Sequence, residues 1–298
     1  MAVAELDAQQ LLTVEEESQW RVILRQFLRH RLAVFGLFVI TVFVLLAVFA
    51  PLITPYDPTR IERGKSDLPP LTEGHWLGTD DLGRDMLARL LYAGRISLFV
   101  GFTVTLCSIT IGTIVGAVSG YYGGLVDSIL MRLVDFMLTL PTLPILLVIS
   151  KIFGKGGNIW LIIIVLVAFG WMGTSRLVRG MVLSLKEQEF IEAERALGAS
   201  TPRIIFMHLL PNSFAPIIVA ATLEVGGVII TEAALSFLGF GIQPPTPTWG
   251  QMLQNVQSDM WTAPWRAFFP GFFIFMTSLS FNFIGDGLRD ALDPRLKV

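Results

Sequence analysis

The chain has 298 residues, of which 53% are hydrophobic and only 15% are charged, and its formal net charge is −2. Soluble domains average ~25% charged residues, so this composition indicates a polytopic membrane protein, and the net charge gives no electrostatic footprint for nucleic acid. The single cysteine, Cys107, excludes an internal disulfide framework, and three scattered histidines do not make a metal site without further ligands.

The first 50 residues predict a basic helix followed by a membrane span. Residues 1–31 are charged and are expected to be cytoplasmic. Apolar residues between Trp20 and Leu28 fall on one helical face and arginines on another, which is typical of a helix in the membrane interface. A solvated basic flank is the alternative. Residues 32–50 carry no charge and can cross a ~30 Å hydrocarbon core, so we interpret them as a retained first span, not a cleaved signal peptide.

Residues 51–95 are rich in proline and charge, which predicts an irregular extracytoplasmic loop. Its last part fits an amphipathic helix that begins near Leu82. Asp85 and Arg89 are four residues apart in the favourable order for an ion pair, which would be worth a few tenths of a kcal/mol.

Five further apolar stretches predict five more spans, at about 96–119, 128–150, 159–175, 214–238 and 267–284. Gly112, Gly116 and Gly120 recur every fourth residue in the second span. Small residues at this spacing permit close helix approach in lipid, so we expect this ridge to face another helix, preferably of the same subunit. Pro141 and Pro144 predict a bend or a break in the third span.

A polar segment, residues 185–212, separates the fourth and fifth predicted spans. Its glutamates prevent it from crossing hydrocarbon, and its composition predicts a helix over about 185–197. Gly198 stands where a helix ends in the left-handed conformation. A Ser-Thr-Pro run at 200–202 predicts a second short helix that stops near Pro211. This polar loop is suited to docking against a partner; an ordinary amphipathic loop is the alternative.

Lysine and arginine gather before the first span, around the polar loop and at the chain end. With six spans these three regions fall on one side, so both termini and the polar loop are expected to be cytoplasmic. The 51–95 loop holds six Lys/Arg on the other side, but longer loops contribute less to this rule.

Four motifs resemble one family. Glu192-Ala193, with Gly198 six residues after Glu192 and then Leu210-Pro211, resembles the "EAA" loop of permease subunits of bacterial ABC importers, although Glu194 replaces the second alanine. Three strings resemble the C-type permeases of dipeptide and oligopeptide importers: GTDDLGRD (78–85), LSFLGFGIQPPTPTWGQML (235–253) and FNFIGDGLRDALDPRLK (281–297). Together they cover nearly the whole chain after residue 30.

The resemblance implies an all-α polytopic membrane protein with the type I ABC importer transmembrane fold, in which six transmembrane helices carry a cytoplasmic coupling helix between the fourth and fifth. The chain would comprise an N-terminal segment (1–31), a first span (32–50), an extracytoplasmic loop (51–95), a core permease domain (96–288) that includes the polar loop (185–212), and a cytoplasmic tail (289–298). The expected ATPase contacts are Glu192, Ala193, Glu194, Leu197, Gly198 and Ala199.

The resemblance also implies partners in the bacterial inner membrane: a second, homologous permease in a heterodimer, two ATPase subunits, an extracytoplasmic substrate-binding protein, and lipid. The only Gly-Lys-Ser, at 64–66, has Thr59 where a phosphate-binding loop needs its first glycine. The chain is therefore expected not to be an enzyme and to hold no cofactor or metal, while the partner subunits bind ATP and Mg²⁺.

Two acids in the fifth predicted span are candidates for the translocation path. Glu224 and Glu232 are eight residues apart, so they fall roughly on one helical face. A charge near the bilayer centre costs ~2.5–3.5 kcal/mol on insertion scales, so each should face the bundle interior or water. We interpret Glu232 as lining, or lying beside, the path, where it could meet the ammonium end of a peptide. A protonated or helix-paired structural acid is the alternative.

The substrate implied by the resemblance is a di- or oligopeptide, with nickel, metallophore complexes, glutathione or sugars as alternatives on the same scaffold. Two other classes of protein remain open. An ATP-independent secondary transporter would need internal repeats, and the sequence has no self-similar halves. A structural membrane scaffold would share the spans but would not need the polar loop.

Overall fold

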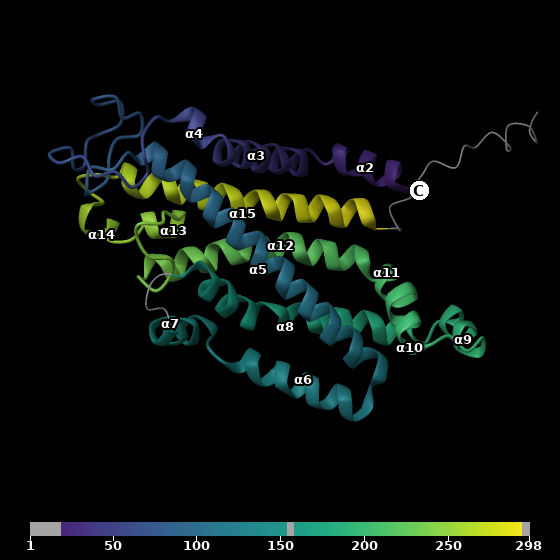
Figure 1. Ribbon diagram of the computed structural model, residues 1–298. Coiled ribbons are helices and arrows are strands. Elements are labelled where there is room, and N and C mark those ends of the chain that lie inside the picture. The colour runs from purple at the N-terminus through teal and green to yellow at the C-terminus, as the bar shows by residue number, and fades with distance from the viewer. Residues whose placement is uncertain (1–18, 154–157, 294–298) are drawn as a thin grey trace, which may run out of the picture.

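The computed structural model describes residues 19–153 and 158–293, and in these ranges the chain forms helices and connecting loops with no β-strand. Most of the long helices run side by side along one direction, one long helix crosses them obliquely, and the irregular segments gather at the two ends of the bundle (Figure 1). Residues 1–18 and 294–298 lie outside the described ranges, and with them part of the predicted cytoplasmic segments and the basic residues Arg295 and Lys297.

Five described helices are long and apolar enough to cross a membrane. They are α3 (Arg31–Val48), α5 (Met86–Tyr122), α8 (Ile159–Leu185), α12 (Phe214–Phe237) and α15 (Trp265–Leu292). A sixth span is obtained if the bent pair α6 (Gly124–Thr139) and α7 (Thr142–Phe153) counts as one. The prediction of an all-α bundle of six spans is confirmed in this form.

The third predicted span is broken. The axes of α6 and α7 differ by 88°. Leu140, between them, has the extended conformation (φ −76°, ψ 137°) that a following proline favours, and Pro141 has no backbone N–H to continue the helix. The predicted bend at this position is therefore confirmed, and α7 lies across one end of the bundle (Figure 1).

Several predicted helix limits are wrong. No separate amphipathic helix begins near Leu82, because the helix starts at Met86 and continues without interruption as the 37-residue α5. The fourth span does not stop near residue 175; α8 continues to Leu185. Two arginines in this extension of α8 form ion pairs with acids of α6. Arg176 contacts Asp135, and Arg179 donates two hydrogen bonds of 2.5 and 2.6 Å to Asp127.

The glycine ridge of α5 lies against α8, within the same chain. A Cβ added at Gly116 would stand 2.8 Å from Val178 Cβ, and one at Gly120 would stand 3.0 Å from Val182 Cβ. A Cβ at Gly112 would stand 2.7 Å from Thr174 Cβ. Real side chains do not approach so closely, so the two backbones touch along this ridge.

The first membrane helix, α3, packs against α15. A Cβ at Gly36 of α3 would stand 2.6 Å from Ser280 O, so these two helices also meet backbone to backbone. Before α3, α2 (Gln19–Arg29) packs Ile23 and Phe27 onto the last turns of α15, while Leu24 and Leu28 remain exposed.

The two ends of the bundle differ in character (Figure 1). One end holds the cap, which we define as residues 54–85 together with α13 (Trp249–Met252) and α14 (Val256–Asp259); α4 (Ala50–Ile53) leads into it. The other end holds α2, the end of α15 and the polar loop. The polar loop contains α9 (Glu189–Ala196), α10 (Thr201–Arg203), the π-helical η1 (Ile204–Leu209) and α11 (Leu210–Asn212).

The cap is tied into the membrane helices by one aromatic side chain. Trp249 of α13 is 1% exposed and packs against Phe43 of α3 and Phe273 of α15. Its indole N–H donates to Leu90 O of α5 at 3.1 Å. A buried indole needs such a partner, so the contact fixes α13 relative to three helices at once.

Candidate functional site

The helix α9 ends in a complete glycine cap. Gly198 has φ +78°, the left-handed conformation that the sequence predicts there. Its N–H donates to Arg195 O, and the N–H of Ala199 donates to Glu194 O, both at 3.0 Å. These two bonds form the Schellman motif, which satisfies the last carbonyls of the helix and turns the chain sharply.

The helical structure after this turn continues further than predicted. Helical segments follow one another from Thr201 to Asn212, with a π-helical stretch in the middle, and only Ser213 separates them from α12. The first helix is also shorter than predicted, since it begins at Glu189 and not near residue 185. The polar loop is therefore a series of short helical segments, of which α9 is the first, between the ends of α8 and α12.

One face of α9 is anchored to the bundle. Ile191 is fully buried in a cluster with Ile204 and Leu209 of η1, and with residues at the ends of α5 and α8. Glu194 Oε1 lies 3.5 Å from His208 Nε2, and the guanidinium of Arg195 lies 5.6 Å from the centre of the Tyr121 ring. These contacts fix the orientation of α9.

The opposite face of α9 is open. Glu192, Ala193, Leu197 and Gly198 are exposed, and Leu197 is 84% exposed. Glu194 and Ala199 are half-buried. The six residues predicted as ATPase contacts thus divide into four that are free on the surface and two that also contact their own loop. In Figure 1, α9 projects from the bundle at the end where α2 and α15 also end.

Two of the motifs quoted above meet in the cap. Asp80 accepts from the backbone N–H groups of Leu82 and Arg84, both at 2.9 Å, and its second oxygen lies 2.6 Å from Arg84 Nε and 3.3 Å from Arg89 Nε. Arg89 in turn donates to Gln251 Oε1 at 2.7 Å. The segment 78–85 is thereby connected to the segment 235–253, which lies more than a hundred residues away.

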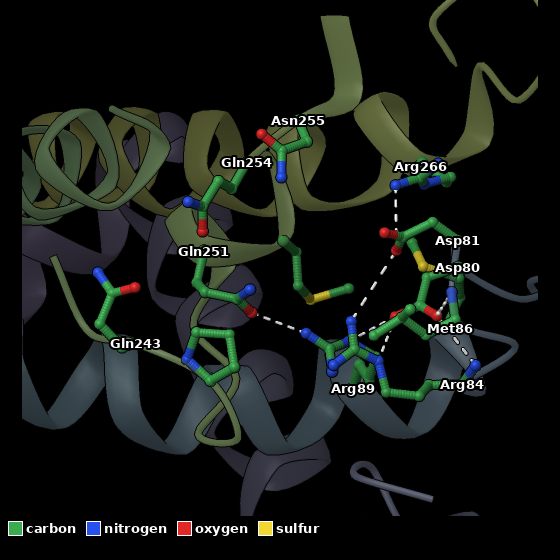
Figure 2. A pocket seen from close by; sticks show the side chains of 13 residues that line it. Asp80, Asp81, Arg84, Met86, Arg89, Gln243, Gln251, Gln254, Asn255 and Arg266 are labelled. Atoms are coloured by element: carbon green, nitrogen blue, oxygen red, sulfur yellow. Dashed lines mark hydrogen bonds and ion pairs between the residues drawn. The ribbon is translucent and has the colours of Figure 1, made fainter. Parts of the chain in front are cut away.

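A third arginine closes this cluster from the start of α15. Arg266, 3% exposed, lies 3.0 Å from Asp67, 3.2 Å from Asp81 and 2.7 Å from Asp259. A cavity of about 260 Å³ remains among these charged groups. Figure 2 shows Arg89 between Gln251 and the aspartates, with Arg266 reaching Asp81 from the other side.

The predicted ion pair between Asp85 and Arg89 is wrong. Asp85 is the N-cap of α5: one of its oxygens accepts from Ala88 N at 2.7 Å, and the other lies 2.8 Å from His75 Nδ1. Both Asp85 oxygens have other partners, and Arg89 contacts Asp80 and Gln251 instead. Sequence reasoning found no role for the polar residues of this segment; in the structure they cap the longest helix and connect the cap to it.

Glu232 lies in a closed environment. It is 1% exposed, and its Oε1 accepts from Ser236 Oγ at 2.7 Å and from Thr248 Oγ1 at 3.1 Å. Thr248 is also the N-cap of α13, since it accepts from Gln251 N at 3.0 Å. Glu232 therefore joins α12 to α13, and this is the helix-paired alternative that the sequence left open.

Glu224 lies near the middle of α12 and lines a second cavity of about 260 Å³. The walls of this cavity come from α7, α8 and α12. The side chains of Ser108 and Thr174 lie close to the Glu224 carboxyl group. The surroundings of the two acids therefore differ: Glu224 borders a cavity, whereas Glu232 is fully buried and bonded to two hydroxyl groups, although one oxygen of each acid is buried without a hydrogen-bond partner.

Comparison with known proteins gives consistent matches. Residues 108–298 match the family described as binding-protein-dependent transport system inner membrane component, and residues 18–70 match the N-terminal TM domain of oligopeptide transport permease C. A dipeptide transport system permease protein of Alkalihalophilus pseudofirmus is 46% identical over 94% of this chain and 91% of its own length.

Two other relatives carry different substrate names. An oligopeptide transport system permease protein of Bacillus subtilis is 41% identical over 94% of this chain and 91% of its own. A glutathione transport system permease protein of Pectobacterium atrosepticum is 43% identical over 93% of this chain and 92% of its own.

Proposed function

The chain belongs to the family of binding-protein-dependent transport system inner membrane components, and we therefore propose that it forms half of the translocation path of an ATP-driven importer of di- or oligopeptides. It is a multi-pass protein of the inner membrane and a permease subunit, a component that is not itself an enzyme. Its family implies an ATPase and an extracytoplasmic binding protein as partners.

Peptides are the substrate class that the names of the relatives favour. Relatives at 41–46% identity are named for dipeptides and for oligopeptides. A relative of similar identity is named for glutathione, which therefore stays as the second candidate. Nickel and metallophore complexes are alternatives on the same scaffold.

The observation that carries the proposal is the open face of α9. An exposed leucine and an exposed acid, on a helix whose other face is anchored, are suited to fit a groove on a partner. Because α9 is held between the ends of α8 and α12, a displacement of α9 is transmitted to both membrane helices. We assign the cytoplasm to this end, together with both termini, and the cap to the extracytoplasmic side.

The assembly that follows has two permeases, this chain and a homologous one, with one ATPase subunit on each polar loop. ATP and Mg²⁺ are bound by the ATPase subunits, and this chain needs no cofactor. The binding protein delivers substrate at the cap. Nucleotide shifts the bundle between an inward-facing and an outward-facing state only if it binds these two states with different free energy.

The first test is on Gly198. Gly198→Val places a β-branched residue at φ +78°, which costs about 1–2 kcal/mol and tilts α9. Gly198→Asn is the matched control, because asparagine tolerates this conformation. We expect the ATPase subunits to copurify with the Asn variant and to be largely lost from the Val variant. Equal recovery with both variants would argue against docking through α9.

The second test concerns energy source and substrate. The complete complex in proteoliposomes, supplied with binding protein, is expected to accumulate labelled dialanine only when ATP is enclosed with the ATPase subunits. Competition by unlabelled glutathione or nickel ranks the alternative substrates. Uptake by the purified chain without ATP would favour the secondary transporter instead.

A further inference from the structure

The cavity beside Glu224 lies at the level of the bilayer centre. Glu224 is near the midpoint of α12, Gly170 is near the midpoint of α8, and Ser108 is close to the midpoint of α5. A Cβ added at Gly170 would stand 3.1 Å from Glu224 Oε1. The missing side chain at Gly170 therefore leaves room for the carboxyl group of Glu224.

The Glu224 carboxyl group has an unused acceptor. Ser108 and Thr174 lie close to it, but its Oε1, like the Ser108 hydroxyl, is buried without a hydrogen-bond partner. Among the residues that the structure describes, no lysine, arginine or histidine forms an ion pair with Glu224. An acid inside a membrane helix normally has a cationic partner or water, because an uncompensated charge is costly there.

The walls of the cavity are suited to a small ligand group. Leu146, Leu166, Phe169 and Val228 are apolar, whereas Thr142 and Thr231 add polar side chains to the lining. Thr142 and Gly227 are exposed, so the cavity opens to the surface of the chain. Thr142 is also the first residue of α7, so the break between α6 and α7 places the first turn of α7 at the opening.

The size of the cavity limits what it can hold. Sites that enclose a drug-sized ligand are about 300–1,000 Å³, so a cavity of about 260 Å³ holds one end of a peptide and not a whole one. A carboxylate accepts hydrogen bonds and does not donate, and an ammonium group donates three. The two groups are complementary in charge and in hydrogen bonding.

From this geometry we propose that Glu224 and its cavity form a mid-membrane site that receives the ammonium group of the translocated substrate. The proposal rests on the proposed function, since it assumes a peptide as cargo. It assigns different roles to two acids of one helix: Glu224 contacts the cargo, and Glu232 positions α13.

Cysteine labelling tests whether the site is open to the path, independently of the cargo. The chain has one native cysteine, so Cys107→Ser gives a clean background. In the complete complex, Glu224→Cys should react with a water-soluble cationic methanethiosulfonate, and Glu232→Cys should stay unmodified because buried cysteines are inert. Equal reactivity of the two positions, with and without ATP, would overturn the proposal.

Transport tests the assigned role. We expect Glu224→Gln to lower dialanine import about tenfold, the effect of losing one charge-assisted hydrogen bond, and Glu224→Asp to retain most of it. Copurification of the ATPase subunits should be unchanged in both variants. Import by Glu224→Gln at the wild-type rate would refute the site. If the wild-type complex imports no peptide, the proposed function fails, and the labelling experiment still decides whether the cavity belongs to a path.

Discussion

Glu224 and Glu232 lie on the same apolar helix, yet their carboxyl groups have different surroundings because different elements pack against them. Glu232 meets Thr248, which lies sixteen residues further along the chain, whereas Glu224 meets Ser108 from a distant helix. A sequence pattern can place both acids on one face of α12, but it cannot tell which of them meets a hydroxyl from the cap and which a cavity. Both acids remain predictions for the translocation path, and our proposal assigns the contact with the cargo to Glu224.

Glu232 supports a prediction at the scale of one residue. Glu232→Ala removes the acceptor of two buried hydroxyl groups and leaves them unsatisfied, so we expect a loss of about 2 kcal/mol in stability. Glu232→Gln keeps the volume and one acceptor oxygen and should lose less. The melting temperature of the purified complex in detergent measures both. If Glu232→Gln were fully stable but changed the preference for charged substrates, Glu232 would belong to the path after all.

At the scale of elements, the sequence was most reliable where a local rule decides the structure. Gly198 ends α9 and Pro141 breaks the third span because both effects act within a few residues. Helix ends were predicted less well. The charge of Arg176 predicts an end of the fourth span there, but α8 continues through this position because acids of α6 pair with Arg176 and Arg179. Such a partner, some forty to fifty residues away, is not visible in a hydropathy pattern.

The contact between α5 and α8 supports a prediction for a pair of helices. At Gly116 an added methyl group would stand 2.8 Å from Val178 Cβ and 3.0 Å from Arg179 N, so Gly116→Ala should destabilise the bundle by about 1–3 kcal/mol. Gly180→Ala, on α8, is the matched control because nothing lies within 4 Å of its added methyl group. There alanine should be neutral, or stabilising by roughly 0.5–1 kcal/mol. Equal melting temperatures for the two variants would contradict the close packing.

At the scale of the whole molecule, the structure places segments that are distant in sequence at the same end of the bundle. The polar loop lies with α2 and the end of α15, and the cap lies at the opposite end (Figure 1). This arrangement agrees with the expectation that an even number of spans separates α2 from the chain end. The distribution of lysine and arginine predicts that the end with the polar loop is cytoplasmic, as we propose above.

The orientation is testable because the chain has one cysteine. In a Cys107→Ser background, Leu71→Cys places a thiol in the cap and Leu197→Cys places one on α9, at positions that are 85% and 84% exposed. A membrane-impermeant maleimide should label Leu71→Cys in intact cells, and it should label Leu197→Cys only after the membrane is opened. Since a bound ATPase would cover Leu197, labelling there should also rise when the ATPase subunits are not expressed. Labelling of Leu197→Cys in intact cells would place α9 outside the cell, where no ATPase subunit could reach it.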